Sequence, residues 1–124
     1  MERLEKQKLY SESVLPGWWP ILDKYLPQFR ALDPNCELYI KEKFGYLRLR
    51  AISQTLPPTA FLELSAQAEF ESGTVCEYCG QPGKIRPKRA WRKTLCDRCY
   101  RLNRNGKNKA AREAEQRWIE RQEE

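Results

Sequence analysis

The sequence contains no histidine among its 124 residues. This absence excludes histidine triads, histidine-ligated zinc enzymes and imidazole proton shuttles. Long apolar runs are missing too: no segment approaches the roughly 20 residues of a membrane-spanning helix, and residues 1–15 lack the apolar region of a signal peptide. We therefore expect a cytoplasmic protein that has no membrane partner.

Acidic residues are scarce in one part of the chain. Between Lys84 and Arg112, twelve Lys or Arg residues stand against a single acid, Asp97, which gives this segment a formal charge of +11. The rest of the chain holds eleven basic and sixteen acidic residues, or −5. The formal net charge of +6 therefore combines a mildly acidic body with a strongly basic segment, and predicts an anionic partner for that segment.

Four of the five cysteines form two Cys-x-x-Cys pairs that are separated by sixteen residues. Each pair brings two sulfurs to one side of a tight turn, and four thiolates suit a tetrahedral zinc ion. Two disulfides, a redox pair and an iron–sulfur cluster are the alternatives, of which disulfides are disfavoured without a secretory signal. A site of four cysteines has no open position for substrate. The sequence therefore predicts one structural Zn²⁺ ion bound by Cys76, Cys79, Cys96 and Cys99.

Residues 1–74 are predicted to form an α+β body of helices around one hairpin. Residues 1–14 indicate a weak helix, and the apolar period over 18–32 indicates a second helix, kinked at Pro27. A third helix is expected from an N-cap at Thr59 to about residue 71.

The sequence also predicts the burial of three individual side chains in this body. Trp18 and Trp19 are adjacent and are not expected to face one core together. Either one of them is exposed as a partner contact, or Trp19 lies beneath the N-terminal helix. The fifth cysteine, Cys36, is expected to be a buried core thiol.

Residues 36–52 alternate in polarity, which predicts a β-hairpin. It should turn at Phe44 and Gly45, because glycine allows a positive φ. In this register Ile40 faces Leu49 on the core side. The other side is either a solvated sheet face or a stacking surface for single strands, and it carries Tyr39, Lys41, Lys43, Tyr46, Arg48 and Arg50.

Residues 75–106 are predicted to form the zinc module, and 107–124 a helical tail. Short strands suit the segment between the two cysteine pairs. Residues 96–106 do not alternate and predict a helix that stops at Asn105-Gly106. Knuckle, hairpin, knuckle and helix, in that order, make a treble clef. The expected fold is therefore an α+β body, a four-cysteine treble clef and a C-terminal helix.

The run CEYCG (76–80) and the segment WRKTLCDRCYRLNRNG (91–106) resemble a GATA-type zinc finger over about 31 residues. The resemblance implies a treble clef whose helix and following basic tail contact DNA. By position it implicates Arg92, Arg98, Arg101 and Arg104.

A second resemblance covers most of the chain. The motifs GWWPIL (17–22), KEKFGYLR (41–48), CEYCGQPG (76–83) and TLCDRC (94–99) are similar to a family of short bacterial and phage proteins of no established activity. The resemblance implies a prokaryotic or viral cytoplasmic protein from mobile or conflict-related gene neighbourhoods.

The leading hypothesis is a non-enzymatic zinc module that binds nucleic acid through its basic C-terminal surface. No local pair of carboxylates defines an acid–base site. Trp91 is expected to stack on a base or to pack on the zinc core. The alternative is a protein-binding inhibitor, of the immunity or phage anti-defence type, that occludes a toxin or defence component. The residues expected to contact nucleic acid are Lys84, Arg86, Lys88, Arg89, Arg92, Lys93, Arg98, Arg101 and Arg104.

Overall fold

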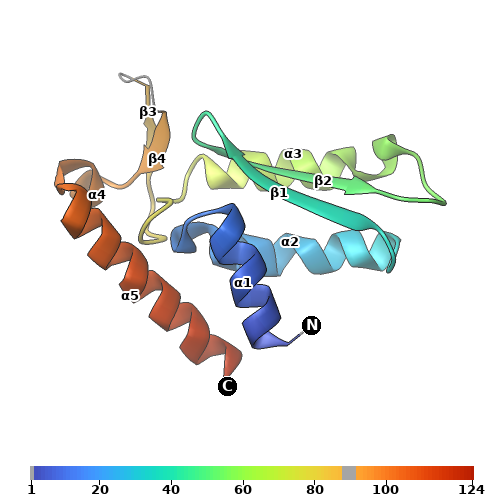
Figure 1. Ribbon diagram of the computed structural model, residues 1–124. Helices are drawn as coiled ribbons and strands as arrows, with labels where there is room; N and C mark the ends of the chain where they lie inside the picture. The colour runs from blue at the N-terminus through green and yellow to red at the C-terminus, as the bar shows by residue number, and fades with distance from the viewer. Residues whose placement is uncertain (1, 88–91) are drawn as a thin grey trace.

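A computed structural model describes residues 2–87 and 92–124 of the chain, so Lys88, Arg89 and Trp91 lie outside the described residues (Figure 1). The described part is α+β, as predicted. Its elements follow in the order α1 (Arg3–Ser13), 3₁₀ turn η1 (Pro16–Trp18), α2 (Trp19–Leu32), β1 (Glu37–Lys43), β2 (Tyr46–Ile52), 3₁₀ turn η2 (Pro58–Phe61), α3 (Leu62–Ser72), β3 (Lys84–Arg86), β4 (Lys93–Leu95), α4 (Asp97–Arg101) and α5 (Arg104–Gln122).

The β1–β2 hairpin has the register that the alternation predicts, with Lys43 opposite Tyr46 and Ile40 opposite Leu49. Its inner face is buried and is covered by α3 and α2 (Figure 1). Serines of α3 fasten the hairpin: Ser72 Oγ accepts a hydrogen bond from the Leu47 N–H at 2.9 Å. The hairpin's other face is turned toward solvent.

Helix α2 follows its apolar period and continues through Pro27, which is exposed. It packs on α3 near the stacked rings of Phe29 and Phe61, whose centroids are 5.7 Å apart. The predicted N-cap at Thr59 is wrong. The turn η2 precedes α3, and Thr59 makes no capping hydrogen bond there.

Both adjacent tryptophans are fully buried in one core, so the expectation that Trp18 and Trp19 cannot share it is wrong. Trp18 ends the turn η1 and Trp19 begins α2, and this change of helix type directs the two rings differently. The Nε1 atom of Trp18 donates to the Val75 carbonyl at 2.9 Å. The Nε1 atom of Trp19 donates to the Val14 carbonyl at 3.1 Å, beneath α1.

Helix α5 completes this core from the C-terminal end of the chain. The Trp118 ring lies 5.1 Å from the Trp19 ring, and Trp118 Nε1 donates to Asp23 of α2 at 2.8 Å. The predicted helix stop at Asn105-Gly106 is wrong. Asn103 Oδ1 accepts from the Gly106 N–H at 2.7 Å and so caps α5, which begins at Arg104.

The cysteine pairs and the strands between them lie beside the tip of the β1–β2 hairpin (Figure 1). Buried Cys36 is the core thiol that was expected, 1% exposed. Among residues 2–87 and 92–124, no helix is long and apolar enough to cross a bilayer.

Candidate metal centre

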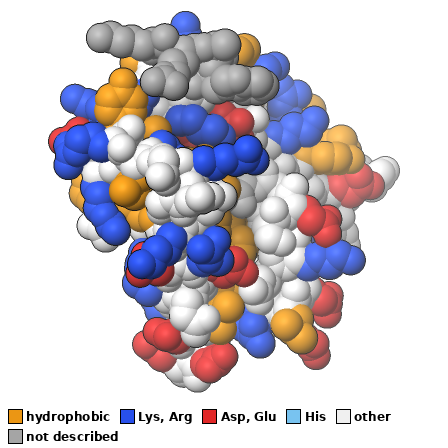
Figure 2. All heavy atoms as spheres, turned by 60° about the vertical axis from the view of Figure 1, so that its left-hand side comes forward, with side chains coloured by type: hydrophobic (Ala, Val, Ile, Leu, Met, Phe, Trp, Pro, Cys, Tyr) orange, Lys and Arg blue, Asp and Glu red, His pale blue; other side chains and the backbone are white. Residues whose placement is uncertain are grey.

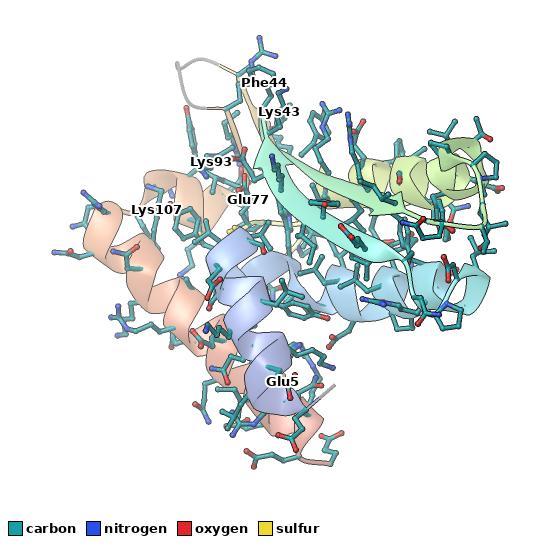
Figure 3. The ribbon with its side chains drawn as sticks, turned by 45° about the vertical axis from the view of Figure 1, so that its right-hand side comes forward. Glu5, Lys43, Phe44, Glu77, Lys93 and Lys107 are labelled. Carbon is teal, nitrogen blue, oxygen red and sulfur yellow. The ribbon has the colours of Figure 1, made fainter. Side chains whose placement is uncertain are left out.

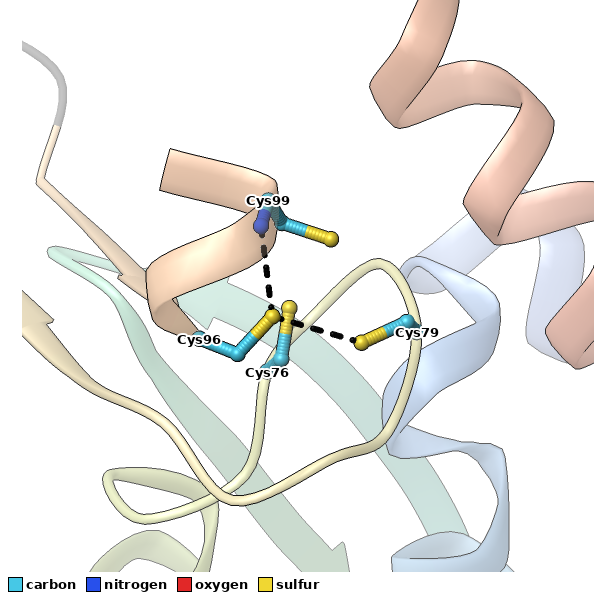
Figure 4. Close-up of side chains that lie close together, drawn as sticks. All are labelled: Cys76, Cys79, Cys96 and Cys99. Carbon is cyan, nitrogen blue, oxygen red and sulfur yellow. Dashed lines mark hydrogen bonds between the residues drawn. The ribbon is translucent and has the colours of Figure 1, made fainter. Parts of the chain in front are cut away.

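The two Cys-x-x-Cys pairs converge on one point (Figure 4). Their four sulfurs lie within 4.8 Å of one another, and all four residues are buried. The sulfurs of Cys79 and Cys96 are 3.6 Å apart. This is close to the distance of about 3.8 Å between two sulfur ligands of a tetrahedral ion with metal–sulfur bonds of about 2.3 Å. The cysteines are free thiols rather than disulfides. The cluster can therefore hold one metal ion.

Local backbone structure brings each pair into place. In the first knuckle, the Gly80 N–H donates to the Cys76 carbonyl at 2.9 Å, and Gly80 has a left-handed φ of 82°, which glycine adopts without strain. In the second, Cys96 is the N-cap of α4, and its sulfur accepts from the Cys99 N–H at 3.3 Å. The β3–β4 hairpin joins the two knuckles, which gives the expected order of a treble clef.

The surroundings of Cys79 and Cys99 disfavour the thiolate form when no cation balances its charge. Burial raises the pKa of Cys79 to about 11, and burial together with the nearby Cys76 also raises the pKa of Cys99. Burial opposes ionisation of Cys96 as well, but the hydrogen bond from the Cys99 N–H brings its pKa below the usual value. A bound cation would offset this cost, because a metal ion favours the thiolate form of its ligands.

A buried carboxylate stands between the two ligands of the first knuckle. Glu77 is 1% exposed, and its Oε2 atom accepts from the Thr94 N–H at 2.8 Å. Lys93 Nζ lies 3.4 Å from its Oε1 atom (Figure 3). Burial raises the pKa of Glu77 to about 7, and the Lys93 charge opposes this increase. The sequence motifs assigned no role to Glu77, although an acid inside a knuckle that precedes a basic run was an available signal.

The first knuckle and strand β4 contact the α+β body directly. The Gly17 N–H donates to the Glu77 carbonyl at 2.8 Å, and a Cβ atom on Gly17 would lie 2.1 Å from the Cys76 carbonyl oxygen. Thr94 Oγ1 donates to the Gly45 carbonyl at the hairpin tip at 2.7 Å. The sequence did not predict the Gly17 contact, because Pro16-Gly17 indicates only an interruption between two helices.

Most of the basic residues expected to contact nucleic acid are exposed around this centre. Figure 2 shows basic side chains concentrated in the upper half of the face that carries α4 and α5, and acids in the lower half. Five of the expected residues are exposed and form no ion pair within the described part of the chain, namely Lys84, Arg92, Arg98, Arg101 and Arg104.

Two of the expected residues have partners inside the module. Arg86 donates to the Leu95 carbonyl and to Asp97 at 2.8 Å, and its guanidinium lies 4.3 Å from the Tyr100 ring centroid. Lys93 is paired with Glu77.

No family model, curated protein or solved structure matches the chain. The two resemblances carried by the sequence motifs therefore stay predictions, and the chemistry of the site is argued from its own geometry.

Proposed function

We propose that the cysteine cluster binds one zinc ion and that this ion holds in place a basic surface that binds nucleic acid. The metal's role is structural, because four cysteine ligands fill a tetrahedral ion and leave no position for substrate. This is a binding function rather than catalysis.

The composition of the module's own core supports a structural ion. Beyond the four cysteines, the buried cluster contains only Leu95 and Ala110 among the described residues, with Tyr78 and Leu102 packed against it. So little apolar surface cannot stabilise a fold alone. Zinc binding contributes on the order of 10 kcal/mol to the folding of comparable peptides.

The observation that carries nucleic-acid binding is the convergence of basic side chains from separate elements on Asp97. The Arg86 hydrogen bond holds the pKa of Asp97 below its ordinary value, and the charges of Lys84 and Arg101 lower it further. One carboxylate thus balances little of the positive charge gathered on β3 and α4. Such a surface suits phosphate contacts, which position a nucleic acid without reading its bases.

The test is the salt dependence of binding to labelled oligonucleotides, followed by fluorescence anisotropy. Affinity should fall as salt rises, with a log–log slope of about −0.7 to −0.9 per phosphate contact. The triple variant Arg98→Gln, Arg101→Gln, Arg104→Gln should reduce the magnitude of that slope by about 2 to 3.

The matched control removes the same formal charge away from the zinc module, with Lys8→Gln, Arg30→Gln and Arg121→Gln, and should leave the slope nearly unchanged. Binding that is absent, or equally insensitive to salt in both variants, would count against the proposal.

A second candidate, the protein-binding inhibitor, is favoured by one observation. Helix α3 exposes an apolar stripe with a spacing of four residues, in which Leu62 is 60% and Phe70 78% exposed, with Ala66 between them. A shallow groove of about 620 Å³ runs beside Phe70. Affinity purification from the native host, with protein and nucleic acid analysed together, separates the two: Leu62→Ser with Phe70→Ser should release a protein partner and retain nucleic acid.

A further inference from the structure

The tip of the β1–β2 hairpin holds an aromatic side chain in solvent. Phe44 is 60% exposed and has a φ of 56°, a left-handed conformation that bulky residues rarely adopt. Gly45 follows with a φ of 85°, and its carbonyl is held by Thr94. Asparagine would suit such a turn better than phenylalanine. An exposed ring kept at a backbone cost calls for a role outside the fold.

The surroundings of Phe44 are basic. Lys43 Nζ lies 5.9 Å from the Phe44 ring centroid. Along the outer face of the hairpin, a hollow of about 460 Å³ is lined by Tyr39, Lys41 and Arg50 among others. In the described structure, Lys41, Lys43 and Arg50 form no ion pair, whereas Arg48 pairs with Glu69 at 3.0 Å. The face therefore offers positive charge beside exposed rings.

This face continues into the basic surface of the zinc module. A Cβ atom on Gly45 would lie 2.3 Å from Ile85 Cδ1 of β3 and 3.4 Å from the Arg92 backbone. Figure 3 shows Lys43 and Phe44 beside the β3–β4 strands. A strand bound along the hairpin would thus pass directly to Lys84 and Arg92.

We propose that the outer face of the β1–β2 hairpin binds an unpaired stretch of nucleic acid, with Phe44 stacked on a base and Lys41, Lys43 and Arg50 on phosphates. The inference rests on the proposed function and names its substrate as single-stranded. In a duplex the base faces are already stacked on one another, so Phe44 gains no partner there. Tyr39, about 13 Å along β1 from Lys43, provides a second platform.

The test compares single-stranded and duplex oligonucleotides of one sequence, using four Phe variants and the full chain. Phe44→Ala and Phe44→Asn should weaken single-strand binding about tenfold, which lies in the lower half of the range measured for one base–aromatic stack. Phe44→Trp should retain it, because the ring remains. Phe70→Ala removes an even more exposed ring from α3 and should leave nucleic-acid binding unchanged. Duplex binding should be the same in every variant.

Each other outcome has a defined meaning. If Phe44→Ala binds single strands as the wild type does, or loses duplex binding to the same extent, the inference is overturned and the proposed function stands. A wild-type preference for duplex has the same meaning. If the wild type binds neither form, the proposed function fails and this inference fails with it. Phe44→Asn also serves as the folding control, because asparagine suits this turn. If its far-ultraviolet circular dichroism is unchanged, a loss of binding is not caused by a loss of fold.

Discussion

Gly17 donates its backbone N–H to the carbonyl of Glu77 at 2.8 Å, so the turn that precedes α2 is in direct contact with the first cysteine knuckle. Neighbouring contacts reinforce this link. Trp18 donates to the Val75 carbonyl, and Arg117 of α5 donates to the Cys79 carbonyl at 3.0 Å. The metal centre and the body therefore share an interface, and a change in one should be felt in the other.

Gly17→Ala tests the close approach at this interface. Its Cβ atom would lie 2.1 Å from the Cys76 carbonyl oxygen, a backbone atom that cannot rotate away. We expect the free energy of unfolding to fall by about 2 kcal/mol or more, measured by chemical denaturation in the presence of zinc. Gly73→Ala is the control, because the nearest atom to its Cβ belongs to the Tyr46 ring, which can move. Equal stability of Gly17→Ala and wild type would contradict the close packing.

Thr94→Val tests the link between β4 and the hairpin tip. The substitution leaves the Gly45 carbonyl without the hydrogen bond that Thr94 Oγ1 donates at a buried position. The free energy of unfolding should fall by about 1 to 3 kcal/mol. Thr74→Val removes a similar bond at an exposed position, to the Glu71 carbonyl, and should change stability by no more than about 0.5 kcal/mol. Matching effects at the two sites would show that the tip is not fastened through Thr94.

Two arginines of the basic segment should behave differently when replaced by glutamine. Arg86→Gln removes hydrogen bonds to Leu95 and Asp97 and the stacking on Tyr100, so it should lower the thermal unfolding midpoint. Arg98→Gln should leave that midpoint unchanged and weaken nucleic-acid binding, because Arg98 is exposed and forms no ion pair within the described residues. The opposite assignment of the two effects would overturn the division between supporting and contacting residues.

The local patterns in the sequence predicted much of the body. Strict alternation determined the hairpin register pair by pair, and the helical period identified the buried side of α2. Two tight knuckles with short spacing were sufficient to predict the cysteine cluster, because each pair is a local structure.

Predictions failed where contacts distant in sequence decide the outcome. Trp118 of α5 packs against Trp19 and enlarges the core, and no sequence pattern near Trp19 predicts this contact. The backbone hydrogen bond between Gly17 and Glu77 joins residues that are sixty positions apart in the chain. The failure at Asn105-Gly106 was local instead, because the Asn103 cap two residues earlier outweighed a familiar helix stop signal.

Removal of the metal should loosen more than the cysteine module. Treatment with a zinc chelator should abolish hydrogen-exchange protection in β4 and α4, because their buried cluster consists mainly of the cysteines. Protection should also decrease at Gly45, which is tied to Thr94, while the amide of Leu49 in the main core stays protected. Uniform loss across the chain, or no loss at all, would contradict this arrangement.

The metal content of freshly purified, reduced protein tests the central claim most directly. Elemental analysis should find about one zinc per chain in the wild type and in Cys36→Ser, whose cysteine lies in the body core, and almost none in Cys96→Ser. A wild-type protein without zinc, one that carries iron instead, or a Cys96→Ser variant with full zinc content would contradict it.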